Sequence, residues 1–216
     1  MLLGGRYGLS NGNSNRRSWR ISDLAQHLGA MTTGDVSQEV RQLSTLKGAG
    51  PGSLSFLANP RYTKQLQQTR ASAVLVTPSM ASECPVTALV VDNPYLAYAN
   101  ISHWFDPSPS LAEGVHATAV IEDDVQLGKS VAIGPHVVIG AGAVIGDGVS
   151  IGAGSVVGAG STLGNGSTLR ANVTLYHGVS LGERCHVHSG SVIGADGFGW
   201  ANDQGRWVKI AQIGGV

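Results

Sequence analysis

An aliphatic residue recurs at every sixth position from Val115 onward, and no other feature of this 216-residue chain constrains its fold as strongly. Fourteen consecutive positions of this period hold only valine, isoleucine or leucine: Val115, Ile121, Leu127, Ile133, Ile139, Ile145, Ile151, Val157, Leu163, Leu169, Leu175, Leu181, Val187 and Ile193. The next residue is glycine at nine of the fourteen. A period of six fits neither an α-helix nor a simple alternating strand, and it is typical of hexapeptide β-helix repeats.

Each hexad is expected to form one short strand and one turn. The aliphatic residue points inward, and three hexads close one triangular coil, so fourteen hexads make between four and five coils. Stacked coils bury a column of aliphatic side chains. The glycine after each aliphatic residue is expected to take a turn conformation that a Cβ would disfavour. The sequence therefore predicts a left-handed parallel β-helix over residues 115–216.

The residues before the repeat alternate helical and strand signals. Short strands are predicted over 53–58, 72–77 and 88–92, and a helix over 21–28 with Ser22 as a possible N-cap. Two further helices, over 61–69 and 95–105, follow the pairs Asn59-Pro60 and Asn93-Pro94, in which asparagine caps and proline opens the helix. These patterns predict a small α/β domain over residues 19–106, a flexible leader over 1–18 and a linker over 107–114.

The composition excludes several classes of protein. Lys+Arg and Asp+Glu both number 14, so a formally neutral chain has no overall attraction to nucleic acid or to anionic membranes. With 42% hydrophobic residues the chain is not intrinsically disordered, and no apolar run reaches the length of a membrane span. Cys84 and Cys185 are too few for a disulfide framework or a cysteine zinc site. A reduced, cytoplasmic protein without a metal centre is the simplest interpretation.

Phe56, Asn59 and Tyr62 form the first candidate binding site. They are spaced at i, i+3 and i+6 across a strand end and a helix start. Aromatic faces stack on a planar base, and an amide pairs with the edge of that base. The alternative is that both aromatic residues belong to the core and that Asn59 only caps the helix.

The repeat is interrupted after Ile193 by the segment ADGFGWANDQGRW at 195–207, predicted to be a loop insertion over about 195–209. Such insertions often lie on the binding face of a repeat protein, but this one can equally shield an edge of the prism. The sequence of residues 210–216 then predicts a return to the hexad pattern.

Three histidines, His177, His186 and His188, lie in the late hexads. Histidine is a natural general base for acyl transfer, but these three have no obvious carboxylate partner in the sequence. His103 and His116 are expected to lie on the surface or in the linker.

Several of these segments together carry a family resemblance. FLANPRY (56–62) and NPYLAYA (93–99) precede the hexads, which contain ANVTLYH (171–177) and HSGSVIGADGFGWANDQGRWVKIAQIG (188–214). In these motifs, over about residues 19–216, the chain resembles the UDP-3-O-(3-hydroxyacyl)glucosamine N-acyltransferases of lipid A biosynthesis.

The resemblance implies a homotrimeric acyltransferase that moves a 3-hydroxyacyl chain from acyl carrier protein to the 2-amine of UDP-3-O-acyl-glucosamine. It implies a uridine site at Phe56, Asn59 and Tyr62, and no metal or dissociable cofactor, because the acyl chain arrives on the phosphopantetheine of the carrier. The catalytic histidine of the family lies in a later coil, downstream of Val216, so the resemblance assigns that role to no residue here and suggests a C-terminally truncated protein.

Two other functions stay open at this point. The chain is also compatible with a nucleotide-binding scaffold that performs no catalysis, since a β-helix does not by itself imply chemistry. It is also compatible with a sibling acyltransferase acting on another UDP-sugar.

Overall fold

The structure, a computed structural model, describes residues 18–108 and 110–216, so the leader predicted over 1–18 lies outside the described residues except for Ser18. The chain divides into two compact units, one up to residue 109 and one from residue 110 to residue 216. Each unit has its own hydrophobic core and is described by itself.

The first unit is built on a five-stranded sheet in the order β2-β7-β6-β5-β4. The four strands β4 to β7 are parallel, and β2 pairs with β7 in the antiparallel direction. A separate antiparallel pair joins β1 and β3. The strands are β1 (Trp19–Arg20), β2 (Met31–Thr33), β3 (Glu39–Val40), β4 (Gln42–Leu43), β5 (Ser53–Phe56), β6 (Ala73–Val76) and β7 (Thr87–Val90).

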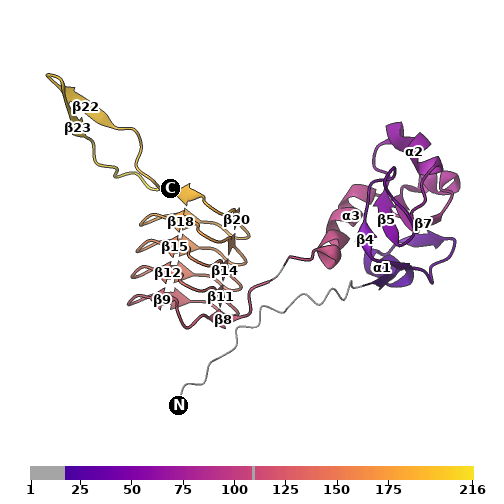
Figure 1. The fold of residues 1–216 in the computed structure, drawn as a ribbon, viewed down its shortest axis with the longest axis horizontal. Helices are drawn as coiled ribbons and strands as arrows, with labels where there is room; N and C mark the ends of the chain where they lie inside the picture. The colour runs from indigo at the N-terminus through magenta and orange to yellow at the C-terminus, as the bar shows by residue number, and fades with distance from the viewer. Residues whose placement is uncertain (1–17, 109) are drawn as a thin grey trace, which may run out of the picture. The chain divides into compact units, whose positions relative to one another are not determined.

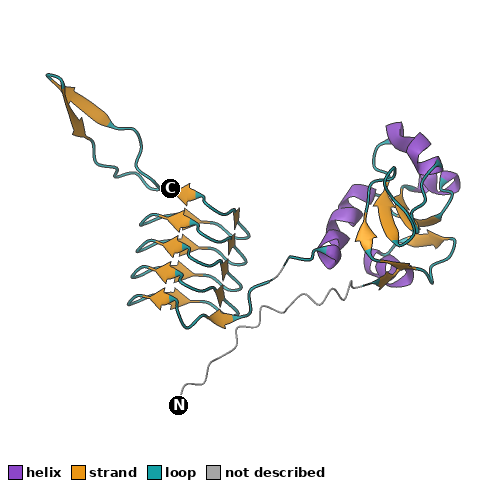
Figure 2. Cartoon of the chain, in the orientation of Figure 1, coloured by secondary structure: helices purple, strands orange, loops and turns teal. Residues whose placement is uncertain are grey.

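Helical segments cover both faces of this sheet (Figure 2). One face packs against α1 (Ile21–Leu28) and α3 (Pro94–Ser102), which continues into the 3-10 turn η3 (His103–Phe105). The other face packs against α2 (Thr63–Gln67) and the 3-10 turn η2 (Pro78–Glu83). A parallel sheet covered on both sides explains why β6 and most of β7 read as continuous apolar runs.

The helix starts agree with the sequence at both Asn-Pro pairs and differ at α1. The Asn59 side chain accepts a hydrogen bond from the Arg61 N–H, and Asn93 accepts one from the Leu96 N–H, both at 3.0 Å. Behind Asn59 the helix predicted over 61–69 is a 3-10 turn, η1 (Pro60–Tyr62), followed by the short α2. Ser22 is not the N-cap of α1, because that helix begins at Ile21 and its N-cap is Arg20, which makes no side-chain cap.

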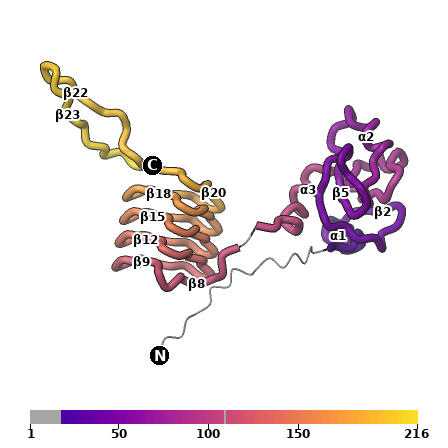
Figure 3. The backbone as a smooth tube through the Cα atoms, viewed as in Figure 1, coloured from indigo at the N-terminus to yellow at the C-terminus, as the bar shows by residue number. Residues whose placement is uncertain are grey.

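The second unit is a left-handed parallel β-helix, as the hexads predict, and its stacked coils are visible in Figures 1 and 3. Its strands form three parallel sheets, in which each residue pairs with the residue 18 positions later, as Ile133 does with Ile151. Three hexads per coil are therefore confirmed. Each of the fourteen two-residue strands ends at one of the periodic aliphatic residues: β8 (Gly114–Val115), β9 (Val120–Ile121), β10 (Gln126–Leu127), β11 (Ala132–Ile133), β12 (Val138–Ile139), β13 (Val144–Ile145), β14 (Ser150–Ile151), β15 (Val156–Val157), β16 (Thr162–Leu163), β17 (Thr168–Leu169), β18 (Thr174–Leu175), β19 (Ser180–Leu181), β20 (His186–Val187) and β21 (Val192–Ile193).

The glycines of the repeat serve two different purposes, and the expected turn role applies to only one of them. Gly140, which follows Ile139, does not have a left-handed φ; a Cβ there would lie 2.5 Å from the backbone nitrogen of Ala159 in the next coil. The left-handed conformation occurs two residues later, at Gly142 with φ +69°. Glycine after the aliphatic residue therefore permits the close approach of two coils at Gly140 and at most other glycines of that series, whereas a Cβ at Gly182 would meet no atom within 4 Å. Gly194 alone in that series has a positive φ.

Three serines form a polar ring inside the otherwise aliphatic core of the β-helix. Ser155, Ser161 and Ser167, here called the serine belt, are fully buried, each two residues before a periodic aliphatic residue. Each hydroxyl donates to a backbone carbonyl 15 residues later and accepts from a backbone N–H 18 residues later. The belt therefore links two coils through side chains as well as through strand pairing.

After Ile193 the chain leaves the coil and forms an antiparallel hairpin of β22 (Trp200–Asp203) and β23 (Arg206–Lys209). It rejoins the ladder at Val216, whose carbonyl accepts from the Ser180 N–H at 2.8 Å. This is later than the return at Ile210 that the sequence pattern predicts. The reason is local pairing: Ile210 N–H donates to Gly199, and Gln212 accepts from Gly197 N–H, so these residues stay with the start of the loop.

Two serines of β5 form a matched pair for a stability measurement. Ser53 accepts from Gln42 Nε2 at 3.0 Å and from Gly50 N–H at 3.3 Å, whereas the equally buried Ser55 hydroxyl has no hydrogen-bond partner. We expect Ser55→Ala to raise the free energy of unfolding by up to about 1 kcal/mol, and Ser53→Ala to lower it by about 1–2 kcal/mol. Urea denaturation checks both; equal losses in the two variants would contradict the assignment.

The serine belt makes a second prediction. Ser161→Ala removes a donor to the Tyr176 carbonyl (2.9 Å) and an acceptor for the buried Val179 N–H (3.2 Å), leaving both backbone groups without these partners. We expect a loss of about 1–3 kcal/mol, seen as faster amide hydrogen exchange at Val179. Ser191→Ala is the control, because the Ser191 hydroxyl makes no hydrogen bond in the described structure; a similar loss there would rule out a specific role for the belt.

Candidate functional site

Phe56 ends β5 at the carboxyl edge of the four parallel strands. In open α/β sheets this edge is where ligands bind. The Phe56 ring is half-buried and lies against two tyrosines of α3, with ring centroids 4.4 Å from Tyr98 and 5.6 Å from Tyr95. Phe56 is thus part of an aromatic cluster that reaches from the core to the surface.

Asn59 is exposed and performs the capping role that its sequence position predicts. Its side-chain oxygen accepts from the Arg61 N–H at 3.0 Å, while its amide nitrogen has no partner among the described residues. A cap and a ligand contact are therefore compatible, because the two ends of the amide group are independent. The free end of Asn59 is a hydrogen-bond donor.

Tyr62 lies at the end of η1 and is 50% exposed, so it is not a core residue. Among the ring contacts of the described residues, Phe56 is paired with Tyr95 and Tyr98 and not with Tyr62. The structure therefore keeps the three predicted residues on one strand–turn–helix segment and adds two tyrosines that the sequence analysis missed. The sequence feature that could have revealed these two tyrosines is the second Asn-Pro pair, because it places Tyr95 and Tyr98 in the first turns of α3.

The arrangement can recognise a planar heterocycle with carbonyl groups on its edge. Aromatic side chains offer stacking surfaces, and the Asn59 amide nitrogen offers a donor for a carbonyl oxygen. Uracil has two such carbonyl groups, so it meets both requirements.

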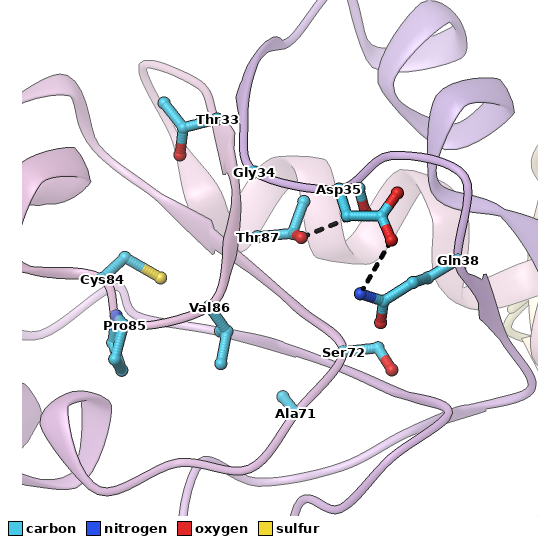
Figure 4. A pocket seen from close by; sticks show the side chains of 10 residues that line it. All are labelled: Thr33, Gly34, Asp35, Gln38, Ala71, Ser72, Cys84, Pro85, Val86 and Thr87. Atoms are coloured by element: carbon cyan, nitrogen blue, oxygen red, sulfur yellow. Dashed lines mark hydrogen bonds between the residues drawn. The ribbon is translucent and has the colours of Figure 1, made fainter.

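A hollow of about 490 Å³ in the first unit lies away from these residues (Figure 4). It opens at the amino-terminal ends of β6 and β7 and contains none of the predicted site residues. Hydrogen bonds from Ser37 and Gln38 lower the pKa of Asp35, and burial raises the pKa of the Cys84 thiol. The Asp35 carboxylate is thus hydrogen-bonded to its neighbours Ser37 and Gln38. Burial disfavours the thiolate of Cys84, which is the reactive form of cysteine.

A second hollow of about 320 Å³ lies beside α3. Leu96 and Asn100 of α3 line one side of it, and residues 27–28 at the end of α1 line another. It too contains none of the predicted site residues.

The late histidines are exposed and dispersed over the β-helix. His177, His186 and His188 make no side-chain hydrogen bond or ion pair in the part of the chain that the structure describes. His186 lies on β20 beside Thr168 of β17. Within residues 18–108 and 110–216 there is no group of three His, Cys, Asp or Glu side chains placed to hold a metal ion. The geometry assigns a catalytic base to none of these histidines.

The hairpin exposes most of its large apolar side chains, including Trp207 at 63% and the preceding Phe198 at 101%. Lys209 lies over the Trp200 ring and pairs with Asp196 at 3.2 Å. The hairpin thus shields no edge of its own prism with these aromatic residues.

None of the described helices is long and apolar enough to cross a membrane.

Two family models match the sequence. Residues 37–104 match the model of UDP-3-O-(3-hydroxymyristoyl) glucosamine N-acyltransferase, LpxD. Four overlapping segments between residues 118 and 195 match the model of six bacterial transferase hexapeptide repeats. The first match contains the β5–α2 turn and α3, and the second contains most of the coils.

Curated relatives match over both units. The chain is 56% identical over 199 residues to the UDP-3-O-acylglucosamine N-acyltransferase of Pseudomonas paraeruginosa PA7, covering 92% of this chain and 56% of that protein. It is 57% identical over 199 residues to the enzyme of Pseudomonas aeruginosa LESB58 and 56% identical over 197 residues to that of Pseudomonas fluorescens SBW25, with 92% and 91% of this chain and 56% of each relative covered. The chain therefore spans just over half the length of these relatives.

Among solved structures, PerB of Caulobacter crescentus in complex with CoA and GDP-perosamine matches with 23% identity and a TM-score of 0.32 over 64% of this chain and 69% of that one. These values are too low to relate the functions of the two proteins.

Proposed function

The chain belongs to the UDP-3-O-acylglucosamine N-acyltransferase family, and we propose that it acts in lipid A biosynthesis by N-acylating UDP-3-O-acyl-glucosamine. The acyl donor is a 3-hydroxyacyl chain on acyl carrier protein. The first unit binds the uridine end of the acceptor, and the β-helix is the scaffold that assembles into a cytoplasmic homotrimer. Identity of 56–57% to three Pseudomonas relatives across both units supports this proposal.

The proposed reaction forms one amide bond and breaks one thioester. The 2-amine of the sugar attacks the thioester carbonyl, the C–S bond breaks, and the phosphopantetheine thiol leaves. A general base removes the proton from the attacking amine, and a hydrogen-bond donor stabilises the oxyanion. None of the late histidines, His177, His186 and His188, is proposed for the base, because none has a side-chain hydrogen-bond partner among the described residues and the family resemblance assigns the role to none of them.

The single observation that carries the uridine site is the free amide nitrogen of Asn59 at the end of the Phe56 strand. The cap uses the oxygen of this amide, and the amide nitrogen, which has no partner among the described residues, is left as a donor. We propose that Phe56 and Tyr62 supply aromatic surfaces for uracil and that Asn59 donates to one of its carbonyl oxygens.

Asn59→Asp separates these two roles. Aspartate caps a helix start as well as asparagine does, but it replaces the donor by a carboxylate oxygen that repels a carbonyl. We expect the affinity for UDP to fall about tenfold, corresponding to about 1.4 kcal/mol, with the thermal midpoint unchanged. Isothermal titration calorimetry and thermal unfolding measure the two quantities.

Neutral uridine is the control for the added charge. If Asn59→Asp weakens UDP binding but leaves uridine binding unchanged, the effect is electrostatic repulsion of the phosphates and the proposed base contact is wrong. Comparable losses for both ligands support the contact.

Acyl transfer is tested directly by mass spectrometry of the amide product, using 3-hydroxyacyl carrier protein and UDP-3-O-acyl-glucosamine. A Pseudomonas relative serves as the positive control. Because no residue of this chain is proposed as the general base, we expect this chain to bind UDP but to form the amide far more slowly than the relative. Transfer at the rate of the relative would contradict this expectation by showing that the base lies within this chain, and failure to bind UDP while the relative is active would contradict the proposed function.

A further inference from the structure

We propose that Tyr95 forms a third aromatic surface of the uridine site, so that the base contacts Tyr95 as well as Phe56 and Tyr62. This inference rests on the proposed function, because it adds a residue to the same site. The observation behind it is the 5.6 Å distance between the ring centroids of Phe56 and Tyr95, whose planes are tilted by 43°.

The position of Tyr95 follows from the way α3 crosses the sheet. The helix begins after β7, two strands away from β5 in the sheet order, yet it packs against β5 and β6. This crossing returns the first turn of α3 to the end of β5, where Phe56 lies. Residues about 40 positions apart in sequence therefore meet at the edge of the sheet where ligands bind.

Tyr95 is held rigidly at this place. It follows Pro94, whose φ is restricted by its ring, and the preceding Asn93 caps the helix through a 3.0 Å bond from the Leu96 N–H. The backbone that carries Tyr95 is thus ordered before any ligand arrives, which lowers the entropic cost of binding.

The three rings of the cluster differ in exposure, and this difference suggests their roles. Tyr98 is half-buried and packs on Phe56 at 4.4 Å, so it supports the Phe56 ring from the core side. Tyr95 is 64% exposed and makes no side-chain hydrogen bond in the described structure. Tyr95 therefore presents free aromatic surface beside Phe56, while Tyr98 does not.

Because the two ring planes are tilted by 43°, a planar base can stack on the Phe56 ring while its edge meets the Tyr95 ring, and both stacked and edge-to-face contacts between aromatic groups are favourable. Base–aromatic stacking is sequence-tolerant, so the two rings provide affinity, while the Asn59 donor provides the preference for a carbonyl-bearing base. The inference concerns the ring of Tyr95 and not its hydroxyl group.

The test is a calorimetric titration of UDP, uridine and ribose 5-phosphate against the unchanged protein and three variants. Tyr95→Ala should weaken UDP and uridine by at least about fivefold, the low end of what one stacked base contributes. Tyr95→Phe keeps the ring and should bind both within about twofold of the unchanged protein. Leu96→Ala is the matched control, because Leu96 is a similarly exposed neighbour, at 56%, on the side of α3 that lines the second hollow.

Ribose 5-phosphate, which lacks the base, should bind all four proteins alike. UDP binding by Tyr95→Ala at the affinity of the unchanged protein would overturn the inference while leaving the proposed function intact. Equal losses in Tyr95→Phe and Tyr95→Ala would also overturn it, because the hydroxyl would then be the binding group. Failure of the unchanged protein to bind either UDP or uridine would overturn the proposed uridine site itself.

Discussion

Parallel backbone pairing between residues 18 positions apart is the interaction on which the β-helix depends. It requires neighbouring coils to approach so closely that a Cβ at Gly140 would lie 2.5 Å from the next backbone nitrogen. It also requires the chain to turn a tight corner in each hexad, which Gly142 permits with its positive φ. The periodic aliphatic side chains, such as Ile139 and Ile151, then fill the interior.

Local backbone hydrogen bonds also shape the first unit. Two Asn-Pro pairs start the helical segments η1 and α3, which follow the parallel strands β5 and β7 in the chain. Each asparagine uses its oxygen for the helix start and keeps its amide nitrogen free. Because α3 crosses back over the sheet, its tyrosines join Phe56 at the end of β5. The proposed uridine site thus depends on helix capping and on the crossing of α3 over the sheet, and its residues line neither of the two hollows.

Much of this could be predicted from patterns along the chain. A period of six predicts coils of three hexads, and asparagine before proline predicts both caps, because these signals arise from contacts within a few residues or from exact repetition. The polarity of the serine belt could not be predicted, since a serine such as Ser161 reads as another small residue until its partners, 15 and 18 positions later, are known. The N-cap of α1 was missed for a related reason: β1 ends where the helix begins, so Arg20 takes the position expected for Ser22.

By itself, the sequence determined the β-helix, the small α/β unit before it, and the segment that holds Phe56, Asn59 and Tyr62, because each is encoded by local order or by a strict period. Only the tertiary structure decided which aromatic rings meet. Tyr95 and Tyr98 reach Phe56 through a helix that starts two strands away, and no local pattern specifies such a crossing. The physical reason is that packing a helix onto a sheet selects contacts by surface shape and apolar burial, which join residues regardless of their separation in the chain.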